Sequence, residues 1–131
     1  MALPHPSLSS VSLSRGECLG LLDDANFARV LLSMGALPAA VPARIALSNR
    51  DNVVISCHEH AVQLAARRGD VISVQIDGHD SDDTAWSVTV TGIAGSVLMD
   101  EIRSDRVKRI ADRGGALVSL PLSVIVGQRG P

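Results

Sequence analysis

Hydrophobic residues recur along the chain with two spacings, one typical of helices and one typical of strands. Near the N-terminus they follow the spacing of an amphipathic helix, at Cys18, Leu21, Leu22 and Ala25. Ser14 and Glu17 stand at the start of this segment in the order of a helix capping box. The pattern predicts a helix that begins after Ser14 and ends at Asp23 and Asp24.

Alternating hydrophobic and polar residues predict strands in much of the remaining chain. The predicted strands cover residues 28–34, 41–48, 53–57, 71–76, 85–98 and 117–126. Gly35 and Pro38 indicate a hairpin turn between the first two strands, and residues 49–52 form a second tight turn. Gly92 and Gly95 interrupt the fifth strand where bulges would let a sheet bend, and Pro121 indicates an edge position or a bulge in the last. Short connections of this kind indicate an antiparallel sheet.

Residues 52–78 are predicted to form a strand, a short helix and a second strand. One side of this helix carries Ala61, Leu64, Ala65 and Arg68. Gly69 and Asp70 end it. A strand that leads into a helix N-terminus presents free backbone amides, which suit an anion such as a phosphate. The alternative is an ordinary crossover in a small barrel, with residues 57–60 (CHEH) as a solvated turn.

A further amphipathic helix is predicted over residues 100–113. Its apolar side is formed by Met99, Ile102, Val107 and Ile110. Together the patterns predict about six strands in a curved antiparallel sheet, with three helices around it and a closed or partly closed barrel shape. Residues 1–12 are predicted to be a flexible lead-in and residues 13–131 a single domain.

The composition narrows the classes of function. A net charge of −2 over 131 residues argues against a large basic face for nucleic acid. Cys18 and Cys57 are too few for a disulfide framework, so buried reduced thiols and a cytoplasmic location are expected. No stretch approaches the length of a membrane span. Because Phe27 and Trp86 are the only aromatic residues, any stacking on a ligand ring has to use one of them.

Four segments of the sequence carry a family resemblance through their order and spacing. They are LSRGECLGLL (13–22), LPAAVPARIAL (37–47), VVISCHEHAVQLAARRGDVISVQID (53–77) and TAWSVTVTGIAGSV (84–97). In these segments the chain resembles the pyridoxamine 5′-phosphate oxidase-like proteins with the FMN-binding split barrel. The resemblance extends over residues 13–128 and implies a mainly β fold, a six-stranded antiparallel split β-barrel with two to three short helices.

The resemblance also implies a homodimer with two FMN sites at the subunit interface and a small-molecule substrate. In this family the phosphate is held by basic and hydroxyl groups of the second strand, the third strand and the following helix. The matching positions, together with the family's tryptophan, are Arg44, Ser56, His58, His60, Gln63 and Trp86.

Two residues depart from the family pattern. Gln63 stands where the helix usually carries Lys, and Glu59 adds a negative charge where a dianionic phosphate would lie. A charge-assisted hydrogen bond to phosphate is about twice as strong as a neutral one, so weaker FMN binding is expected. Arg44 and His60 would compensate in part, since histidine is partly charged near neutral pH.

The CHEH segment also raises the question of metal binding or nucleophilic catalysis. Cys57 and His58 are adjacent in an extended chain and point to opposite faces, and the one other cluster, around His79, offers mainly aspartates. Cys57 ends an apolar strand, which fits an inert thiol. Neither a metal site nor a catalytic acid or base is therefore predicted.

Two functions follow from these observations. The first is an FMN-dependent oxidoreductase of the pyridoxamine 5′-phosphate oxidase-like type with unknown substrate, in which the flavin performs the chemistry. The alternative is a non-catalytic split-barrel binding module that has lost strong FMN binding and takes haem, a deazaflavin or another small ligand. Neither nucleic acid nor a membrane is an expected partner.

Overall fold

The computed structural model describes residues 10–49, 51–111 and 114–130, which form eight strands and four helices. The strands are β1 (Val11–Ser12), β2 (Phe27–Met34), β3 (Leu37–Leu47), β4 (Asn52–Cys57), β5 (Val71–His79), β6 (Ala85–Ile93), β7 (Ala116–Pro121) and β8 (Val124–Arg129). The helices are α1 (Arg15–Asp24), α2 (His60–Arg68), α3 (Met99–Ile102) and α4 (Asp105–Ala111). No helix in these ranges combines the length and the apolar composition that a membrane crossing requires.

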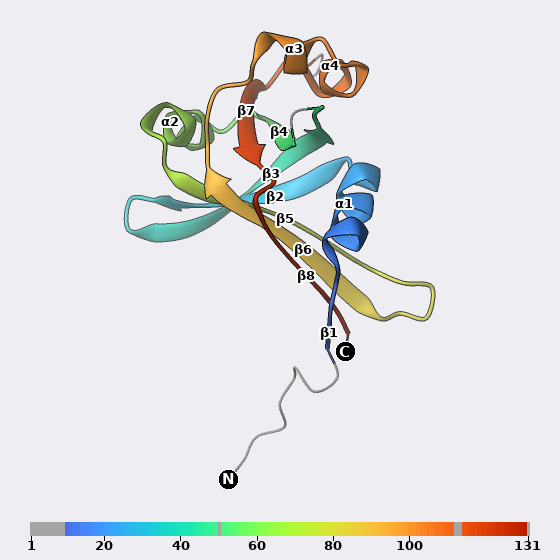
Figure 1. The fold of residues 1–131 in the computed structure, drawn as a ribbon. Helices are drawn as coiled ribbons and strands as arrows, with labels where there is room; N and C mark the ends of the chain where they lie inside the picture. The colour runs from blue at the N-terminus through green and yellow to red at the C-terminus, as the bar shows by residue number, and fades with distance from the viewer. Residues whose placement is uncertain (1–9, 50, 112–113, 131) are drawn as a thin grey trace.

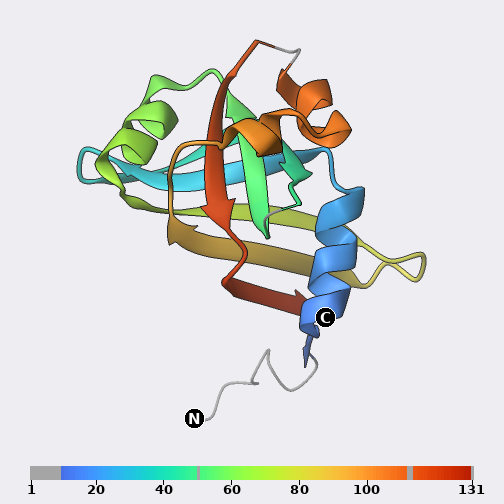
Figure 2. The same ribbon diagram turned by 45° about the horizontal axis from the view of Figure 1, so that its top comes forward.

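The eight strands form one antiparallel sheet in the order β1-β8-β6-β5-β2-β3-β4-β7. The sheet curls, so that β4 and β7 stand across β5 and β6 (Figures 1 and 2). Just beyond β6, Gly95 exchanges two backbone hydrogen bonds of 2.9 Å with Ser119 of β7, which ties the two ends of the curl together. The predicted antiparallel split-barrel fold is confirmed, with eight described strands in place of six and four helices in place of two to three.

The main hydrophobic core fills the inside of this curl. The alternation predicted for β5 and β6 is confirmed by the burial of Ile72, Val74, Ile76, Val88 and Val90. Helices α1 and α2 contribute Cys18, Leu22, Val62 and Ala65 to the same cluster. On the other face of β4, Val54 forms a separate small cluster with Val107 and Ile110 of α4. Strand β4 is therefore covered on both faces.

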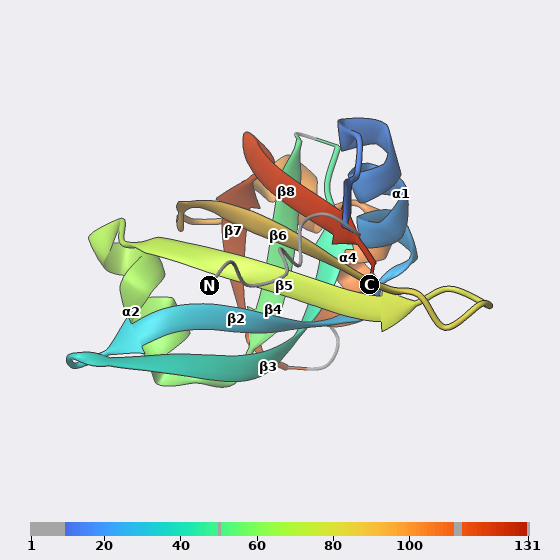
Figure 3. The same cartoon turned by 90° about the horizontal axis from the view of Figure 1, so that it is seen from below.

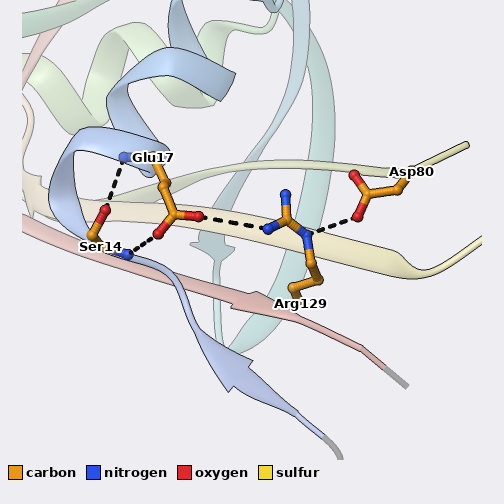
Figure 4. Close-up of polar contacts among 4 residues, drawn as sticks. All are labelled: Ser14, Glu17, Asp80 and Arg129. Atoms are coloured by element: carbon orange, nitrogen blue, oxygen red, sulfur yellow. Dashed lines mark hydrogen bonds and ion pairs between the residues drawn. The ribbon is translucent and has the colours of Figure 1, made fainter.

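The predicted capping box at the start of α1 is confirmed (Figure 4). The Ser14 hydroxyl accepts a hydrogen bond from the Glu17 amide, and the Glu17 carboxylate accepts one from the Ser14 amide, both at 3.1 Å. Glu17 also pairs with Arg129 of β8 at 3.5 Å, and Arg129 pairs with Asp80 at 2.8 Å. The hydrogen bonds from Ser14 lower the pKa of Glu17. The network joins α1, β8 and the turn after β5.

The final predicted strand, residues 117–126, is wrong as a single element. The strand is interrupted at Leu122 and Ser123. Before this point the chain pairs with β4, and after it the chain pairs with β6. Val118, Leu120 and Leu122 are buried as predicted. Beyond the break the alternation changes phase relative to the core, so Val124 and Val126 are 54% and 57% exposed.

Other boundaries also differ from the predictions. Strand β6 ends at Ile93, and the amide of the next residue, Ala94, bonds to the Asp70 carbonyl. The helix predicted over residues 100–113 is divided into α3 and α4, because the Ser104 hydroxyl accepts from the Val107 amide at 3.2 Å and begins a new helix. The β2–β3 turn is at Gly35, with φ 63°, whereas Pro38 lies within β3.

A buried carboxylate fastens α3 to the start of β4. Glu101 is 0% exposed, whereas the predicted apolar residue Met99 is 67% exposed. The Glu101 carboxylate accepts hydrogen bonds from Asn52 Nδ2 at 3.0 Å and from the Leu98 amide at 3.1 Å. Burial raises the pKa of this carboxyl, but hydrogen bonds from Ser48, Asn52 and Leu98 outweigh it and bring the pKa below its ordinary value of 4.5.

Over β2, β5, β6 and β8 the outer face of the sheet carries no helix among the described residues, whereas α4 covers this face at β3 and β4. Figure 3 views β3, β2, β5, β6 and β8 side by side from this face. The paired residues Val71 and Ile93 are 64% and 60% exposed there, and the exposed Val124 and Val126 lie on the same face. We call these four residues the outer apolar patch.

Replacing Glu101 with alanine is expected to lower the free energy of unfolding by about 3 kcal/mol at pH 7, because hydrogen bonds to a charged acceptor are lost. Since the folded-state pKa is lowered, this stabilisation is present above the unfolded-state value of about 4.5 and is lost as the pH falls through the folded-state value. Urea unfolding at pH 7 and at pH 3 measures both effects. The difference in the free energy of unfolding between the wild type and Glu101→Ala should be smaller at pH 3 than at pH 7. An equal difference at both pH values would contradict the stabilising role of the charged carboxylate. Asp105→Ala, at an exposed position in α4, is the control and should cost less than about 1 kcal/mol.

Candidate functional site

A cleft of about 470 Å³ opens where β4 ends and the chain enters α2. It lies between β3, β4 and the turn before α2, and we call it the β3–β4 cleft. Its polar and aromatic lining residues are Phe27, Arg44, Ser56, Cys57, His58 and Glu59. Three of these follow from the sheet register, because Phe27 pairs with Arg44 across β2 and β3, and Arg44 pairs with Ser56 across β3 and β4.

Arg44 supplies the positive charge of the cleft. Its guanidinium carbon lies 4.6 Å from the centroid of the Phe27 ring, within the range of a cation–π contact. No carboxylate of the described residues forms an ion pair with it. The Phe27 side chain is 63% exposed, although an aromatic ring of this size would ordinarily be buried. The guanidinium is thus held by stacking and keeps its hydrogen-bond donors for a ligand.

Ser56 supplies a hydroxyl group. The residue is only 6% exposed, and its hydroxyl makes no hydrogen bond with any residue of the described ranges. Its oxygen is not among the described buried atoms that lack a partner, so the hydroxyl reaches the cleft surface and is open to a ligand or water. Gly115 provides the space beside it, because a Cβ atom there would lie 2.6 Å from Ser56 Oγ and 2.8 Å from the Cys57 amide nitrogen.

The turn into α2 uses its own polar groups. The Cys57 sulfur accepts a hydrogen bond from the Glu59 amide at 3.3 Å, and the Glu59 carboxylate accepts one from the Ala61 amide at 3.5 Å. The expectation of free amides at this helix N-terminus is therefore wrong for Ala61. At the other end Gly69 adopts the left-handed conformation, as its position predicts. The buried side of α2 is formed by Val62 and Ala65, whereas the predicted side included Leu64.

The structure brings three of the six predicted cofactor contacts together. Arg44, Ser56 and His58 line the β3–β4 cleft. His60 is the exposed first residue of α2, and Gln63 lies further along that helix, outside the cleft lining. Trp86 packs against Gly78 and lines a different cavity near the β5–β6 turn. Contact of any of the six with a cofactor remains a prediction.

Sequence reasoning did not assign Phe27 or Gly115 to the site. Phe27 was noted only as one of two aromatics, and its exposure in β2 is visible only in the structure. Gly115 lies next to Ser56 and leaves room for its side chain. Both cysteines are unpaired and buried, and burial raises the pKa of the Cys18 thiol. In the described part of the chain no three His, Cys, Asp or Glu residues are grouped as metal ligands.

The curled antiparallel sheet and the cleft at the end of β4 define a split-barrel protein. The model of a family described as pyridoxamine 5′-phosphate oxidase matches residues 14–126, so this chain belongs to that family. An uncharacterized protein of Mycobacterium tuberculosis is 33% identical over 104 residues, which cover 73% of this chain and 66% of that protein. The chain thus spans just under two thirds of this relative's length.

Solved structures of three flavoproteins share the fold. An FAD-binding protein from Mycobacterium smegmatis superposes with a TM-score of 0.70 at 24% identity, covering 94% of this chain and all of the other. An FAD-binding protein from Mesorhizobium loti gives 0.76 at 18% identity, covering 93% and 99% of the two chains. An FAD- and haem-binding protein from M. smegmatis gives 0.68 at 18% identity, covering 93% and 73%. At these identities the likeness establishes the fold.

Gly115→Ala is expected to destabilise the protein by about 1–3 kcal/mol, because the added methyl group overlaps Ser56 and the backbone of Cys57. Gly95→Ala is the matched control, since a Cβ atom there meets no atom within 4 Å. Thermal or urea unfolding of both variants measures the difference. Equal stability of the two variants would contradict this prediction, because it would show that the protein accommodates the Cβ atom at residue 115 without loss of free energy of unfolding.

Proposed function

We propose that this protein binds a flavin with its phosphate in the β3–β4 cleft and uses it as an oxidoreductase acting on a small molecule. The observation that carries the proposal is the Ser56 hydroxyl, which lines the cleft without a hydrogen-bond partner among the described residues, next to the Arg44 guanidinium, which has no ion-pair partner among them, in a chain of this family. A phosphate needs a cation and hydrogen-bond donors together, and a guanidinium offers them in a geometry that fits two phosphate oxygens. The names of the structural relatives, which bind FAD or FAD and haem, support a flavin.

Each residue of the cleft has a defined part in this proposal. Arg44 donates two hydrogen bonds to phosphate oxygens, and Phe27 holds its guanidinium in place from one side. The Ser56 hydroxyl donates to the same phosphate and thereby gains the partner that it lacks. The flavin itself supplies hydride transfer when bound, so the protein's task is to hold and orient it. FMN is the cofactor that the family resemblance implies.

A second candidate is a binding module without redox activity, and His58 is the observation that favours it. This exposed imidazole stands at the mouth of the cleft and is of the type that ligates haem iron. A haem absorbance band on titration with haem, in a protein that takes up no flavin, would support this candidate.

We also propose that the protein is a homodimer that buries the outer apolar patch. Val71, Ile93, Val124 and Val126 leave an open apolar sheet face, and a second copy of the chain presents the same face in a two-fold arrangement. Phe27 and Arg44 lie on the same outer face by register, so a partner subunit placed there would border the cleft.

Arg44→Ala is expected to weaken flavin binding about 10- to 100-fold, because a charged hydrogen bond contributes about 1.5–3 kcal/mol. Arg109→Ala, which removes an exposed arginine of α4, is the control and should bind as the wild type does. Flavin fluorescence quenching gives the dissociation constants. Loss of flavin colour on anaerobic addition of reduced nicotinamide tests the redox activity. A protein that takes up no flavin, or one in which both variants bind equally, would count against the proposal.

Val126→Glu is expected to convert the dimer to a monomer, because it places a charge in the proposed interface. Met99→Glu makes the same change at a similarly exposed residue of α3 and should leave the dimer intact. Light scattering coupled to size exclusion reports the mass of each. A monomeric wild type would overturn the dimer proposal. The flavin proposal would be unaffected, because the binding measurements test it separately.

A further inference from the structure

The β3–β4 cleft holds a negative charge of the protein itself beside its positive one. Glu59 lines the cleft together with Arg44, and its carboxylate caps the N-terminus of α2 through the Ala61 amide. Among the described residues that line the cleft, Arg44 is the only arginine or lysine. The fixed charges of these described lining residues, one guanidinium and one carboxylate, therefore cancel.

No other cation of α2 compensates for Glu59. Arg67 and Arg68 lie in the last turn of the helix, about 10 Å along its axis from the N-terminus at 1.5 Å per residue. Gln63 is neutral. His58 adds at most part of a positive charge near neutral pH, as imidazoles do in general.

Three backbone donors of the turn are also engaged within the chain. The Glu59 amide donates to the Cys57 sulfur at 3.3 Å, the Ala61 amide to the Glu59 carboxylate, and the Val62 amide to the Glu59 carbonyl at 3.1 Å. Among the side chains of β3 and β4 that line the cleft, the donors left for a phosphate are the Arg44 guanidinium and the Ser56 hydroxyl. A phosphate that is linked to a second phosphate has two free oxygens for these donors, whereas the third free oxygen of a phosphomonoester would add negative charge beside the Glu59 carboxylate.

We infer that Glu59 makes the β3–β4 cleft selective for a flavin whose phosphate carries a single charge because it is linked to a second phosphate, as in a flavin dinucleotide, over the terminal phosphate of FMN. The inference rests on the proposed function, in which this cleft binds a flavin phosphate. A phosphomonoester carries a charge of about −1.5 to −2 at pH 7, and each phosphate of a dinucleotide carries about −1. The second charge of the dinucleotide lies on the next phosphate, and the inference requires this phosphate to lie toward solvent, where salt and water screen it from Glu59.

Dissociation constants for riboflavin, FMN and FAD test the inference, measured by flavin fluorescence with the wild type, Glu59→Gln and Asp83→Asn. In the wild type, FAD is expected to bind about tenfold more tightly than FMN, since one additional like charge near a carboxylate has an effect of this order. Glu59→Gln should tighten FMN binding about tenfold and FAD binding less than about threefold, because the repulsion acts mainly on the second charge. The glutamine oxygen can still cap α2.

Asp83→Asn controls for the change in net charge. Asp83 is exposed, with φ 68° in the turn before β6, a conformation that asparagine tolerates, and it lies outside the cleft lining. This variant should leave the ratio of the FMN and FAD dissociation constants unchanged. A second readout needs no substitution: raising the salt concentration should narrow the gap between FMN and FAD in the wild type, because salt screens the repulsion.

The outcomes separate the inference from the proposed function. Tighter binding of FMN than of FAD, or a Glu59→Gln effect of equal size on both flavins, would overturn the inference while flavin binding stands. Failure of riboflavin, FMN and FAD alike to bind would overturn the proposed function and the inference with it. The inference is supported if the ratio of the FMN and FAD dissociation constants falls to near one in Glu59→Gln and stays at the wild-type value in Asp83→Asn.

Discussion

The structure depends on the burial of both faces of β4. Each residue from Val53 to Cys57 is buried, and successive side chains of a strand point to opposite sides, so each side needs its own cover. The main core covers Val53 and Ile55, and α4 covers Val54. This requirement explains why the chain folds back as α3 and α4 before it returns as β7 beside β4. Glu101 completes the arrangement by binding Asn52 at the beginning of β4.

A strand held in this way positions functional groups accurately. Its beginning is fixed by Glu101, its sides by β3 and β7, and its end therefore delivers Ser56 to a definite place. Arg44 occupies the neighbouring position by register, and its guanidinium is restrained by the Phe27 ring. The two groups that are proposed to hold the phosphate thus belong to paired strands, where the backbone ladder and not a loop sets their separation.

The sequence predicts features that depend on neighbours along the chain and misses those that depend on distant ones. The capping box at Ser14, the alternation in β5 and β6, and the end of α2 at Gly69 are local, and all were predicted correctly. The break after Leu122 arises because the chain changes its pairing partner, which periodicity cannot detect. Glu101 reads as a surface residue until Asn52 is placed beside it. At the site, the family resemblance indicated Arg44 and Ser56. The contact of Phe27 with Arg44 and that of Gly115 with Ser56 become evident only in the folded sheet, because these residues are far apart in the sequence.

The helix N-terminus, which the sequence offered as the anion site, is occupied by the protein's own groups. Glu59 caps it through the Ala61 amide, so this donor needs no ligand. In the proposed site the anion is therefore recognised by side chains of the strands, where the Arg44 guanidinium and the Ser56 hydroxyl remain unengaged among the described residues. A helix terminus attracts any negative group through its dipole. A site built from two directed donors, with a carboxylate beside them, distinguishes anions by their charge and by the number of oxygens that they present. In the proposed site, selectivity would therefore depend on the charge of Glu59 as much as on the donors of Arg44 and Ser56.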